Sequence, residues 1–424
     1  MKRIFFLIII ALPLCGWNSP IFGGEQEFTD SITVDVTNRL NIGRQDVPIS
    51  IKVVSIQKKF PHFNPRACAI FEKGIEIPSQ VDDTNRDGAH DLLTFVISLL
   101  PHERKKIILQ YNPEGVVKRE YEKRTQADLS IKTDYKLVDG KYVDGRFVDI
   151  DSVRVPAVHV DHDALFRHEG PAWESDKVGY RFYLDERNRT DIFGKKVPAM
   201  VLNTAGVHDL VADNNESYES MLNWGMDIFK VGTSLGIGSI AMQTGNEVET
   251  VSKTDSVYCI IAANGPVRSD VRGMYFGWQV GGKKFNLISD YSITAGSRLT
   301  RYHAVIGPNP ENLCTGLAKH AQTVFMESPK RKKKGWGYIA VYGKQSLAHD
   351  ELGIAIFYKA SDLVQHREDP VNYLVVLRPR NGVLTYYFAA AWEQEPNGIK
   401  NADEFRSYLD DAVREFDVPV EISY

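Results

Sequence analysis

The sequence predicts a mainly β protein with a small N-terminal antiparallel β domain, a large two-sheet β-sandwich of the supersandwich type, and one C-terminal helix. Many short segments alternate apolar and polar residues, as 31–38 does, which is typical of half-buried strands. Turn residues separate these segments, and Asn381-Gly382 has the composition of a hairpin turn. Only one segment, near the C-terminus, has clear helical spacing.

The first predicted domain comprises residues 25–115. Its strand candidates follow one another at short, regular spacing, at 31–38, 47–53, 69–71, 76–81, 92–96 and 106–111. This pattern is typical of a small antiparallel sandwich or barrel. A charged and weakly patterned stretch at 116–127 follows, and we interpret it as a linker.

The second predicted domain comprises residues 128–424 and is expected to carry the functional site. Its clearest strand candidates are rich in aromatic and β-branched residues, at 180–184, 257–261, 275–280, 337–342, 353–358, 373–377 and 384–391. Asn401 is a suitable N-cap for a helix whose apolar face consists of Phe405, Leu409, Val413 and Phe416. We therefore expect two large antiparallel sheets packed face to face.

Residues 1–24 have the pattern of a secretory signal peptide, because a short basic start precedes an uncharged apolar run. Cys15 occupies the place of a lipidated cysteine, but Leu14 before it is larger than lipoprotein processing favours, so lipidation is the less favoured outcome. The segment predicts a secreted or periplasmic protein. No later stretch reaches about eighteen consecutive apolar residues, so no stable membrane insertion is expected.

Composition narrows the choice of partners and cofactors. The formal net charge of -4 shows no basic excess, so nucleic acid is not an expected partner. Beyond the signal segment only Cys68, Cys259 and Cys314 remain, which allows at most one disulfide and no Cys-x-x-Cys zinc site. A loose dinucleotide-loop match at 236–241 is not followed by a helix, so no organic cofactor is expected.

The densest titratable cluster lies at 159–176, where three His, three Asp and two Glu occur within 18 residues. Its candidate catalytic residues are His162, His168, Glu169 and Glu174. The strand candidate that follows places Arg181, Tyr183 and Asp185 on one face. That face is either a surface with an ion pair or the floor of an open sugar-binding groove. Imidazole and carboxylate groups in the cluster also suit a metal ion.

Aromatic, cationic and acidic residues elsewhere are candidates for sugar binding. Exposed tryptophans can stack on sugar rings, and arginines bind carboxylate or sulfate with two parallel hydrogen bonds. The candidates are Trp173, Lys195, Trp224, Asp227, Arg268, Arg272 and Trp392. The alternative for each tryptophan is a place in the hydrophobic core.

The segment 83–91 resembles the start of a calcium-binding loop. Oxygen ligands occur at Asp83, Asn85, Asp87 and Asp91, and a glycine occupies the sixth position. Thr94 replaces the glutamate of such loops, and a strand follows instead of a helix. A structural calcium turn and a simple Asp/Asn/Gly-rich hairpin loop therefore both stay open.

Several motifs resemble an exported bacterial family catalogued as domain of unknown function 4861. They are 77–83, 170–176, 180–185, 191–196 and 224–227, and the resemblance covers almost the whole chain after the signal segment. Members look like polysaccharide-utilisation proteins that occur beside lyases and hydrolases for uronic-acid glycans. A small β domain before a large sandwich is also similar to some polysaccharide lyases. The resemblance therefore implies a carbohydrate ligand, but it assigns no catalytic residue.

Three functions follow as hypotheses, all with a polysaccharide or oligosaccharide partner. The leading one is β-elimination on a uronic-acid sugar by a lyase or dehydratase, with Arg181 or Arg272 neutralising the carboxylate, His162 or His168 as base and Tyr183 as acid. The second is glycoside hydrolysis by Glu169 and Glu174. The third is glycan binding without catalysis.

Overall fold

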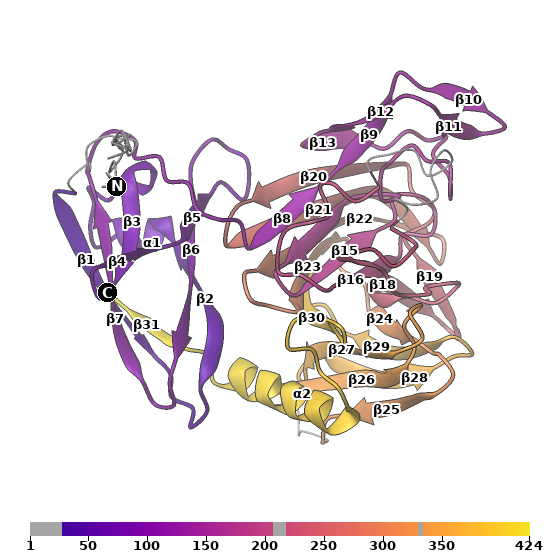
Figure 1. The fold of residues 1–424 in the computed structure, drawn as a ribbon. Coiled ribbons are helices and arrows are strands. Elements are labelled where there is room, and N and C mark those ends of the chain that lie inside the picture. The colour runs from indigo at the N-terminus through magenta and orange to yellow at the C-terminus, as the bar shows by residue number, and fades with distance from the viewer. Residues whose placement is uncertain (1–27, 207–217, 330–333) are drawn as a thin grey trace, which may run out of the picture.

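The computed structural model describes residues 28–206, 218–329 and 334–424, and it is mainly β, with 52% strand and 6% helix. The predicted fold class is confirmed, since antiparallel sheets form two packed units and one long helix lies near the C-terminus (Figure 1). The predicted signal peptide at 1–24, with Cys15, lies outside the described residues. Within the described segments, no helix has the length and hydropathy needed to cross a membrane.

The N-terminal unit is a sandwich of two antiparallel sheets, on the left of Figure 1. One sheet has the order β31-β1-β7-β3-β4, formed by β1 (Asp30–Thr37), β3 (Cys68–Glu72), β4 (Ile75–Ile77), β7 (Arg104–Tyr111) and β31 (Glu421–Ser423). The other has the order β2-β6-β5, formed by β2 (Arg44–Lys52), β5 (Ser79–Asp82) and β6 (Leu92–Leu99). Alternating apolar residues of these strands form one core between the sheets. A short helix α1 (Val53–Gln57) and a 3₁₀ turn (Pro65–Ala67), which the sequence did not predict, connect strands at its edge.

The last strand of the chain belongs to this first unit. β31 pairs antiparallel with β1, in the register Asp35↔Ser423 and Thr37↔Glu421. The sequence analysis placed these residues in the second domain, because three residues carry no signal of a partner that lies far away in the sequence. The chain therefore leaves the N-terminal unit after β7 and returns to it at its end (Figure 1).

The large unit is built on a nine-stranded antiparallel sheet, in the order β13-β20-β21-β22-β23-β30-β27-β26-β25. Its longest strands pair over most of their length, which gives a continuous surface across the molecule. The strands are β13 (Ser152–Arg154), β20 (Ser256–Asn264), β21 (Arg268–Val280), β22 (Lys283–Thr294), β23 (Leu299–Gly307), β25 (Thr323–Glu327), β26 (Trp336–Lys344), β27 (Glu351–Lys359) and β30 (Val383–Trp392).

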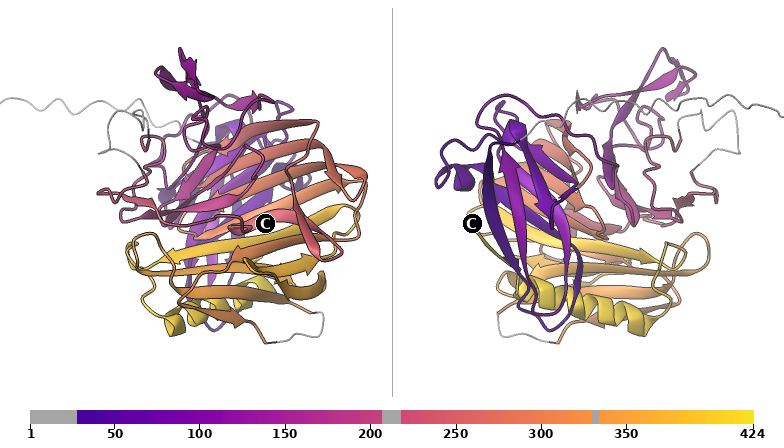
Figure 2. Two further views of the ribbon diagram at one scale, coloured as in Figure 1. Left: turned by 90° about the vertical axis from the view of Figure 1, so that its right-hand side faces the viewer. Right: turned by 60° about the vertical axis from the view of Figure 1, so that its left-hand side comes forward.

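Two five-stranded sheets pack on the inner face of the nine-stranded sheet, and one core joins all three (Figure 2). The first, which we call the small polar sheet, consists of β8 (Thr125–Asp128), β14 (Ala172–Ser175), β15 (Val178–Phe182), β16 (Thr190–Lys195) and β17 (Gly225–Asp227). The second consists of β18 (Ile237–Thr244), β19 (Glu247–Thr250), β24 (Leu313–Ala318), β28 (Leu363–Glu368) and β29 (Asn372–Leu377). The predicted large sandwich is thus present, with its second layer divided between two sheets.

Two short ribbons project from the large unit at the upper right of Figure 1. They are formed by β9 (Ser130–Thr133) with β12 (Arg146–Asp149), and by β10 (Lys136–Val138) with β11 (Lys141–Val143).

Helix α2 (Ala402–Asp417) covers part of the outer face of the nine-stranded sheet (Figure 2, right). Its predicted N-cap is confirmed, since the side chain of Asn401 accepts a hydrogen bond from the backbone N–H of Glu404 at 2.9 Å. The predicted apolar face is also correct, because Phe405, Leu409 and Val413 are buried against β26, β27 and β30. The rest of the outer face, over β20 to β23, is left without a covering helix.

Polar contacts fix the two units against each other. Arg124 donates hydrogen bonds of 2.9 Å to both carboxylate oxygens of Asp46 in the N-terminal unit, and one of 2.7 Å to Asp176 in the large unit. Arg268 at the start of β21 donates to Asp82 in β5 at 2.8 Å. Cys68, Cys259 and Cys314 are buried free thiols, so no disulfide forms among the described residues.

Candidate active site

The small polar sheet has one apolar and one charged face. Alternate residues such as Trp173, Tyr180 and Ile192 point into the core between the sheets. The opposite, outer face is lined by Gln126, Asp128, Glu174, Arg181, Asp191, Lys195 and Asp227, and every one of these side chains is buried. Irregular segments at 157–170 and 197–206 cover this face. Backbone contacts such as Leu184 N to Glu169 O, and the packing of Val201 and Leu202, hold them in place.

Arg181 is the centre of this covered face. Its guanidinium donates to Asp191 at 2.8 and 3.2 Å, to Asp227 at 2.5 Å and to the hydroxyl of Tyr218 at 3.2 Å. A carboxylate oxygen of Glu169 lies 3.4 Å from the same group. All three guanidinium nitrogens of Arg181 therefore have partners, and three acids share one buried cation.

The covered face reaches solvent near His162. Glu169 connects the interior to this opening, since it accepts a hydrogen bond of 2.9 Å from Arg187 and lies 3.6 Å from the imidazole Nδ1 of His162. Asp161 pairs with both His162 and Arg187. The His162 side chain is 67% exposed, whereas that of Arg181 is 6% exposed. The cluster is thus graded from an exposed rim to a closed interior.

The local electrostatics separate the acids of the cluster. Burial opposes the charge of Glu169, but the cations Arg181 and Arg187 outweigh it and hold the pKa of Glu169 below its usual value. Burial, together with the neighbouring charge of Asp191, raises the pKa of Asp227 to about 8. Burial and Asp191 also raise the pKa of Tyr183 well above its usual value; its hydroxyl donates to Asp191 at 2.6 Å. Tyr183 is therefore a protonated hydrogen-bond donor to a carboxylate.

The structure brings together five of the residues that the sequence analysis selected. They are His162, Glu169, Arg181, Tyr183 and Asp227, and each contacts at least one other member or shares the acid Asp191 with it. The face that carries Arg181, Tyr183 and Asp185 is not open, however, because the two irregular segments cover it. Neither an exposed ion-pair surface nor the floor of an open groove describes its interior.

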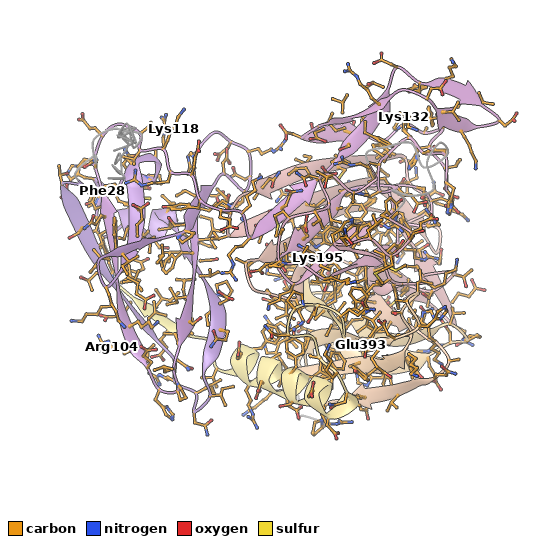
Figure 3. All side chains as sticks on the ribbon, in the orientation of Figure 1. Phe28, Arg104, Lys118, Lys132, Lys195 and Glu393 are labelled. Atoms are coloured by element: carbon orange, nitrogen blue, oxygen red, sulfur yellow. The ribbon has the colours of Figure 1, made fainter. Side chains whose placement is uncertain are left out.

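Glu174 and Lys195 form a separate buried ion pair (Figure 3 labels Lys195). Both side chains are 0% exposed. Glu174 also accepts from the backbone N–H groups of Val201 and Leu202, and Lys195 donates to the carbonyl of Ser175 at 2.6 Å. This pair anchors the covering segment 197–206, and Glu174 does not face a common space with Glu169 as a hydrolase pair would require.

His168 and the predicted tryptophans lie in packed surroundings. The Nε2 of His168 lies 3.0 Å from the carbonyl of Ala205, and burial, with the cations Arg167 and Arg181 nearby, holds the pKa of His168 well below its usual value. Trp173 and Trp392 are core residues whose indole N–H groups donate to Thr300 and Asp350, and Trp224 is partly buried beside Phe193. These positions differ from the expected stacking on sugars, because large rings in the sandwich are needed to fill its core.

The calcium-like loop is closed by its own hydrogen bonds. Asp83 accepts from the backbone N–H groups of Asp87 and Gly88, Asp87 accepts from Ala89, and Asp91 accepts from both N–H and hydroxyl of Thr84. The side-chain oxygen of Asn85 accepts from Asp87 N. These contacts favour the hairpin-loop alternative over the calcium turn, and the choice between the two stays a prediction.

One group has the spacing of metal ligands within the described segments: Asp161, His162 and Glu169, whose donor atoms lie within 4.8 Å of one another. Arg187 forms ion pairs with both acids of this group, at 2.8 Å with Asp161 and 2.9 Å with Glu169. A resident cation therefore already neutralises these ligands, and the group does not fit a metal ion in this arrangement.

Arg268 and Arg272 have different surroundings. Arg268 is buried between Asp82 and Asp270, where it joins the two units. Arg272 lies on the outer face of the nine-stranded sheet, and its Nε donates to Asp290 at 2.6 Å. Asp290 is the cross-strand partner of Arg272, so this second site candidate lies on a half-exposed sheet surface.

That outer face carries two parallel rows across the strands. The registers β20–β21–β22–β23–β30 place Ile260, Arg272, Asp290, His303 and Thr385 in one row. The next row is apolar and consists of Tyr258, Met274, Ile288, Val305 and Val383. All ten side chains are half-buried or exposed. The face is bounded by the N-terminal unit near Asp270 and by α2 near Tyr387.

Arg301, His303 and Tyr387 form a second titratable group on this face. Arg301 and Tyr387 are direct cross-strand partners, and His303 lies two residues from Arg301 on the same side of β23. The Nδ1 of His303 lies 2.8 Å from the hydroxyl of Thr385, while its Nε2 has no hydrogen-bond partner in the part of the chain that the structure describes. Arg301 forms no ion pair with a described acid. All three side chains are half-buried, and the ring of Tyr387 packs against Trp336 and Phe416, so the group is partly accessible and has no acidic partner for Arg301.

The charge state of this group is set by its position. Partial burial, with the cation Arg301 and more weakly Arg272, lowers the pKa of His303, although Asp290 opposes the shift. The imidazole is therefore neutral at neutral pH. Burial raises the pKa of Tyr387, and Arg301 opposes this shift without reversing it. The face thus combines a cation that hydrogen-bonds Tyr387 but has no acidic partner, a neutral imidazole and a protonated phenol.

A shallow hollow of about 370 Å³ lies beside the apolar row, lined by Ser256, Tyr258, Met274 and Phe276. The rings of Tyr258 and Phe276 meet edge to face, with centroids 5.8 Å apart. The guanidinium of Arg154 lies over the Tyr258 ring, 5.9 Å from its centroid, whereas Phe276 is exposed and offers a ring on which the C–H face of a sugar can stack.

The sequence matches the family model described as a domain of unknown function (DUF4861) over residues 36–422. The chain belongs to this family. No curated protein matches the sequence. Among solved structures, the chain is similar to a glycosyl hydrolase family 38 protein from Enterococcus faecalis, with 8% identity and a TM-score of 0.46 over 93% of this chain and 47% of that chain. An α-mannosidase from E. faecalis V583 shares 8% identity with this chain, at a TM-score of 0.46 over 93% of this chain and 46% of that chain. The chain thus spans less than half of either structure.

Sequence reasoning missed Arg301, His303, Thr385 and Tyr387. The segment 299–307 alternates outward Arg301, His303 and Val305 with inward Thr300, Tyr302 and Ala304, which is the same signal that selected Arg181 and Tyr183. Alternation identifies residues that share a face, but it does not show whether a distant segment covers that face.

Proposed function

We propose that the protein is an exported, carbohydrate-active lyase or dehydratase that performs β-elimination on uronic-acid-containing oligosaccharides. The observation that carries this proposal is the half-buried group of Arg301, His303 and Tyr387 on the outer face of the nine-stranded sheet, where Arg301 has no acidic partner. The family resemblance supports a glycan of this class. The signal-like segment at 1–24 supports export to the periplasm or the medium.

Each member of the group matches one requirement of the reaction. Arg301 lacks a carboxylate partner and can bind the uronate carboxylate with its planar guanidinium, which blunts the negative charge that grows during proton removal. His303 is neutral, so the free Nε2 can accept the proton from the carbon beside the carboxylate. Tyr387 is protonated and can donate its proton to the leaving oxygen. Diagonal neighbours on a sheet lie roughly 7 Å apart, which leaves room for one sugar unit between base and acid.

His303 takes the proton, and the electron pair of the broken C–H bond forms a carbon–carbon double bond. The bond between the next carbon and its oxygen breaks with its electron pair, and Tyr387 gives its proton to that oxygen. A proton returns from the imidazolium to the phenolate through solvent. A glycosidic oxygen as leaving group makes the protein a lyase, and a hydroxyl makes it a dehydratase.

The covered face is less suited to this reaction. Arg181 has no free donor for a carboxylate, and Tyr183 is held by Asp191. The side chains of His162, Asp161 and Arg187 approach the surface there, and Arg187 already pairs with three acids. For the hydrolase hypothesis, the complete burial of Glu174 beside Lys195 gives no support.

The test is the ultraviolet absorbance of the unsaturated uronate that elimination produces. Purified protein would be incubated with uronic-acid polysaccharides and their oligosaccharides, and we expect the absorbance to rise with at least one of them. The matched variant Tyr387→Phe should abolish the rise, while its ring keeps the packing against Phe416 at 4.6 Å. New reducing ends without absorbance would replace this proposal with hydrolysis. Binding without any product would leave a glycan-binding protein.

A further inference from the structure

A groove of about 600 Å³ lies between the N-terminal unit and the large unit, away from Arg301 and His303. Its walls come from three parts of the chain. Arg66 and His90 belong to the N-terminal unit, Arg119, Glu120 and Lys123 to the connecting segment, and Asn264 to the end of β20. Clefts between packed units are frequent places for ligands.

The cations of this groove are incompletely neutralised. Arg119 pairs with Glu76 at 2.7 Å, which lies outside the lining. Lys123 makes a long hydrogen bond of 3.4 Å to the Asn264 side chain. Arg66 has no ion-pair partner in the segments that the structure describes, and Glu120 is the one acid among the residues that line the groove. The groove therefore has a positive balance and suits an anion.

Hydrogen bonds between the two units hold the walls of the groove in place. The side chain of Gln80 donates to the carbonyl of Arg268 at 2.9 Å and accepts from the N–H groups of Val267 and Arg268. Arg124 joins Asp46 to Asp176 across the two units. Hydrogen bonds and ion pairs thus connect the two walls, and they fix the shape of the groove.

The groove lies at the end of β20, a strand that also contributes to the outer face of the nine-stranded sheet. Tyr258 and Ile260 of β20 lie on the outer face, and the strand ends beyond a bulge at Asn264, which lines the groove. Six residues of strand span about 20 Å, a distance that an oligosaccharide of several units can bridge.

We propose that this groove binds a second acidic unit of an extended glycan chain, through carboxylate or sulfate groups, while another unit lies on the sheet near His303. This inference rests on the proposed ligand class but not on the elimination chemistry. It predicts that the protein prefers long acidic chains to single units, and that the preference is electrostatic.

Direct binding measurements separate this inference from the reaction. Calorimetry with long oligogalacturonates and with a disaccharide would compare wild type with the double variant Arg66→Glu/Lys123→Glu. We expect about tenfold weaker binding of the long chain by the variant, and unchanged binding of the disaccharide. The matched control is Lys118→Glu/Lys58→Glu, which reverses two exposed lysines outside the groove (Figure 3 labels Lys118).

Unchanged affinity of the groove variant for the long chain would overturn the inference, and so would an equal loss with the control. An equal loss for a neutral glucan would show that charge is not what the groove recognises, and would also overturn it. Absence of elimination, by contrast, would refute the proposed reaction and leave these binding results unaffected.

Discussion

The two outer faces of the large sandwich differ in how their charges are used. On the small polar sheet, Arg181 holds three acids, and irregular segments seal the group from solvent. On the nine-stranded sheet fewer charges are present, but Arg301 and His303 are half-exposed and incompletely paired. A dense titratable cluster therefore marks, in this molecule, the place where polar groups are buried together. Reactivity requires groups that a ligand can still reach.

The largest expected effect is on catalysis at the open face. Tyr387→Phe removes the proposed acid, so kcat should fall by about 10²- to 10⁴-fold in the absorbance assay. Tyr183→Phe is the matched change on the covered face, and it should leave kcat within a few-fold of wild type. If Tyr183→Phe abolishes turnover and Tyr387→Phe does not, the roles of the two faces are reversed.

The next effect is on stability at the covered face. Arg181→Ala leaves Glu169, Asp191 and Asp227 around an empty space without their cation, and we expect the free energy of unfolding to fall by about 3–5 kcal/mol. Arg301→Ala should cost less than about 1 kcal/mol, because Arg301 has no buried acid partner. Urea denaturation followed by circular dichroism measures both. Equal losses would mean that the two faces do not differ as described.

The pH dependence of activity should follow His303. Burial and Arg301 lower the pKa of His303 below about 6.5, the usual value of an imidazole. As pH falls, kcat/KM should therefore stay constant past pH ~6.5 and decrease only at more acidic pH, where His303 becomes protonated. Arg301→Met removes the cation and should move this acid limb to higher pH. A limb that does not move would indicate that another group accepts the proton.

The pH dependence of stability should follow Asp227. Its folded pKa is raised to about 8 by burial and by Asp191, above an unfolded value of about 3.9. The folded state therefore binds more protons between these values, so this group stabilises the fold at low pH and the contribution is lost as pH rises toward 8. Asp227→Asn should flatten the melting temperature over this range. An unchanged slope would show that Asp227 is ionised throughout.

The smallest expected effect concerns the loop 83–91. Its oxygens already accept hydrogen bonds from the loop itself, so we expect calcium and chelators to leave the melting temperature unchanged. A calcium-dependent rise that Asp83→Asn abolishes would instead establish the calcium turn.

The sequence was sufficient for properties that arise within one segment. Alternation located most strands, and the spacing of Asn401, Phe405 and Leu409 located the long helix and its buried face. Properties that depend on contacts with residues far away in the sequence could not be predicted from the sequence. The three residues of β31 do not reveal their pairing with β1, and the sequence near Arg181 does not reveal that the segments 157–170 and 197–206 cover it. The same limit hid His303, whose alternating strand looked like many others.

The most direct test compares two histidines in one assay. His162→Ala and His303→Ala would be measured beside wild type by ultraviolet absorbance on the same acidic oligosaccharide, after their melting temperatures are shown to match. We predict that His303→Ala loses the absorbance rise and that His162→Ala, at the rim of the covered face, keeps it. A rise that persists in His303→Ala and disappears in His162→Ala would contradict this account and place the reaction at the covered face.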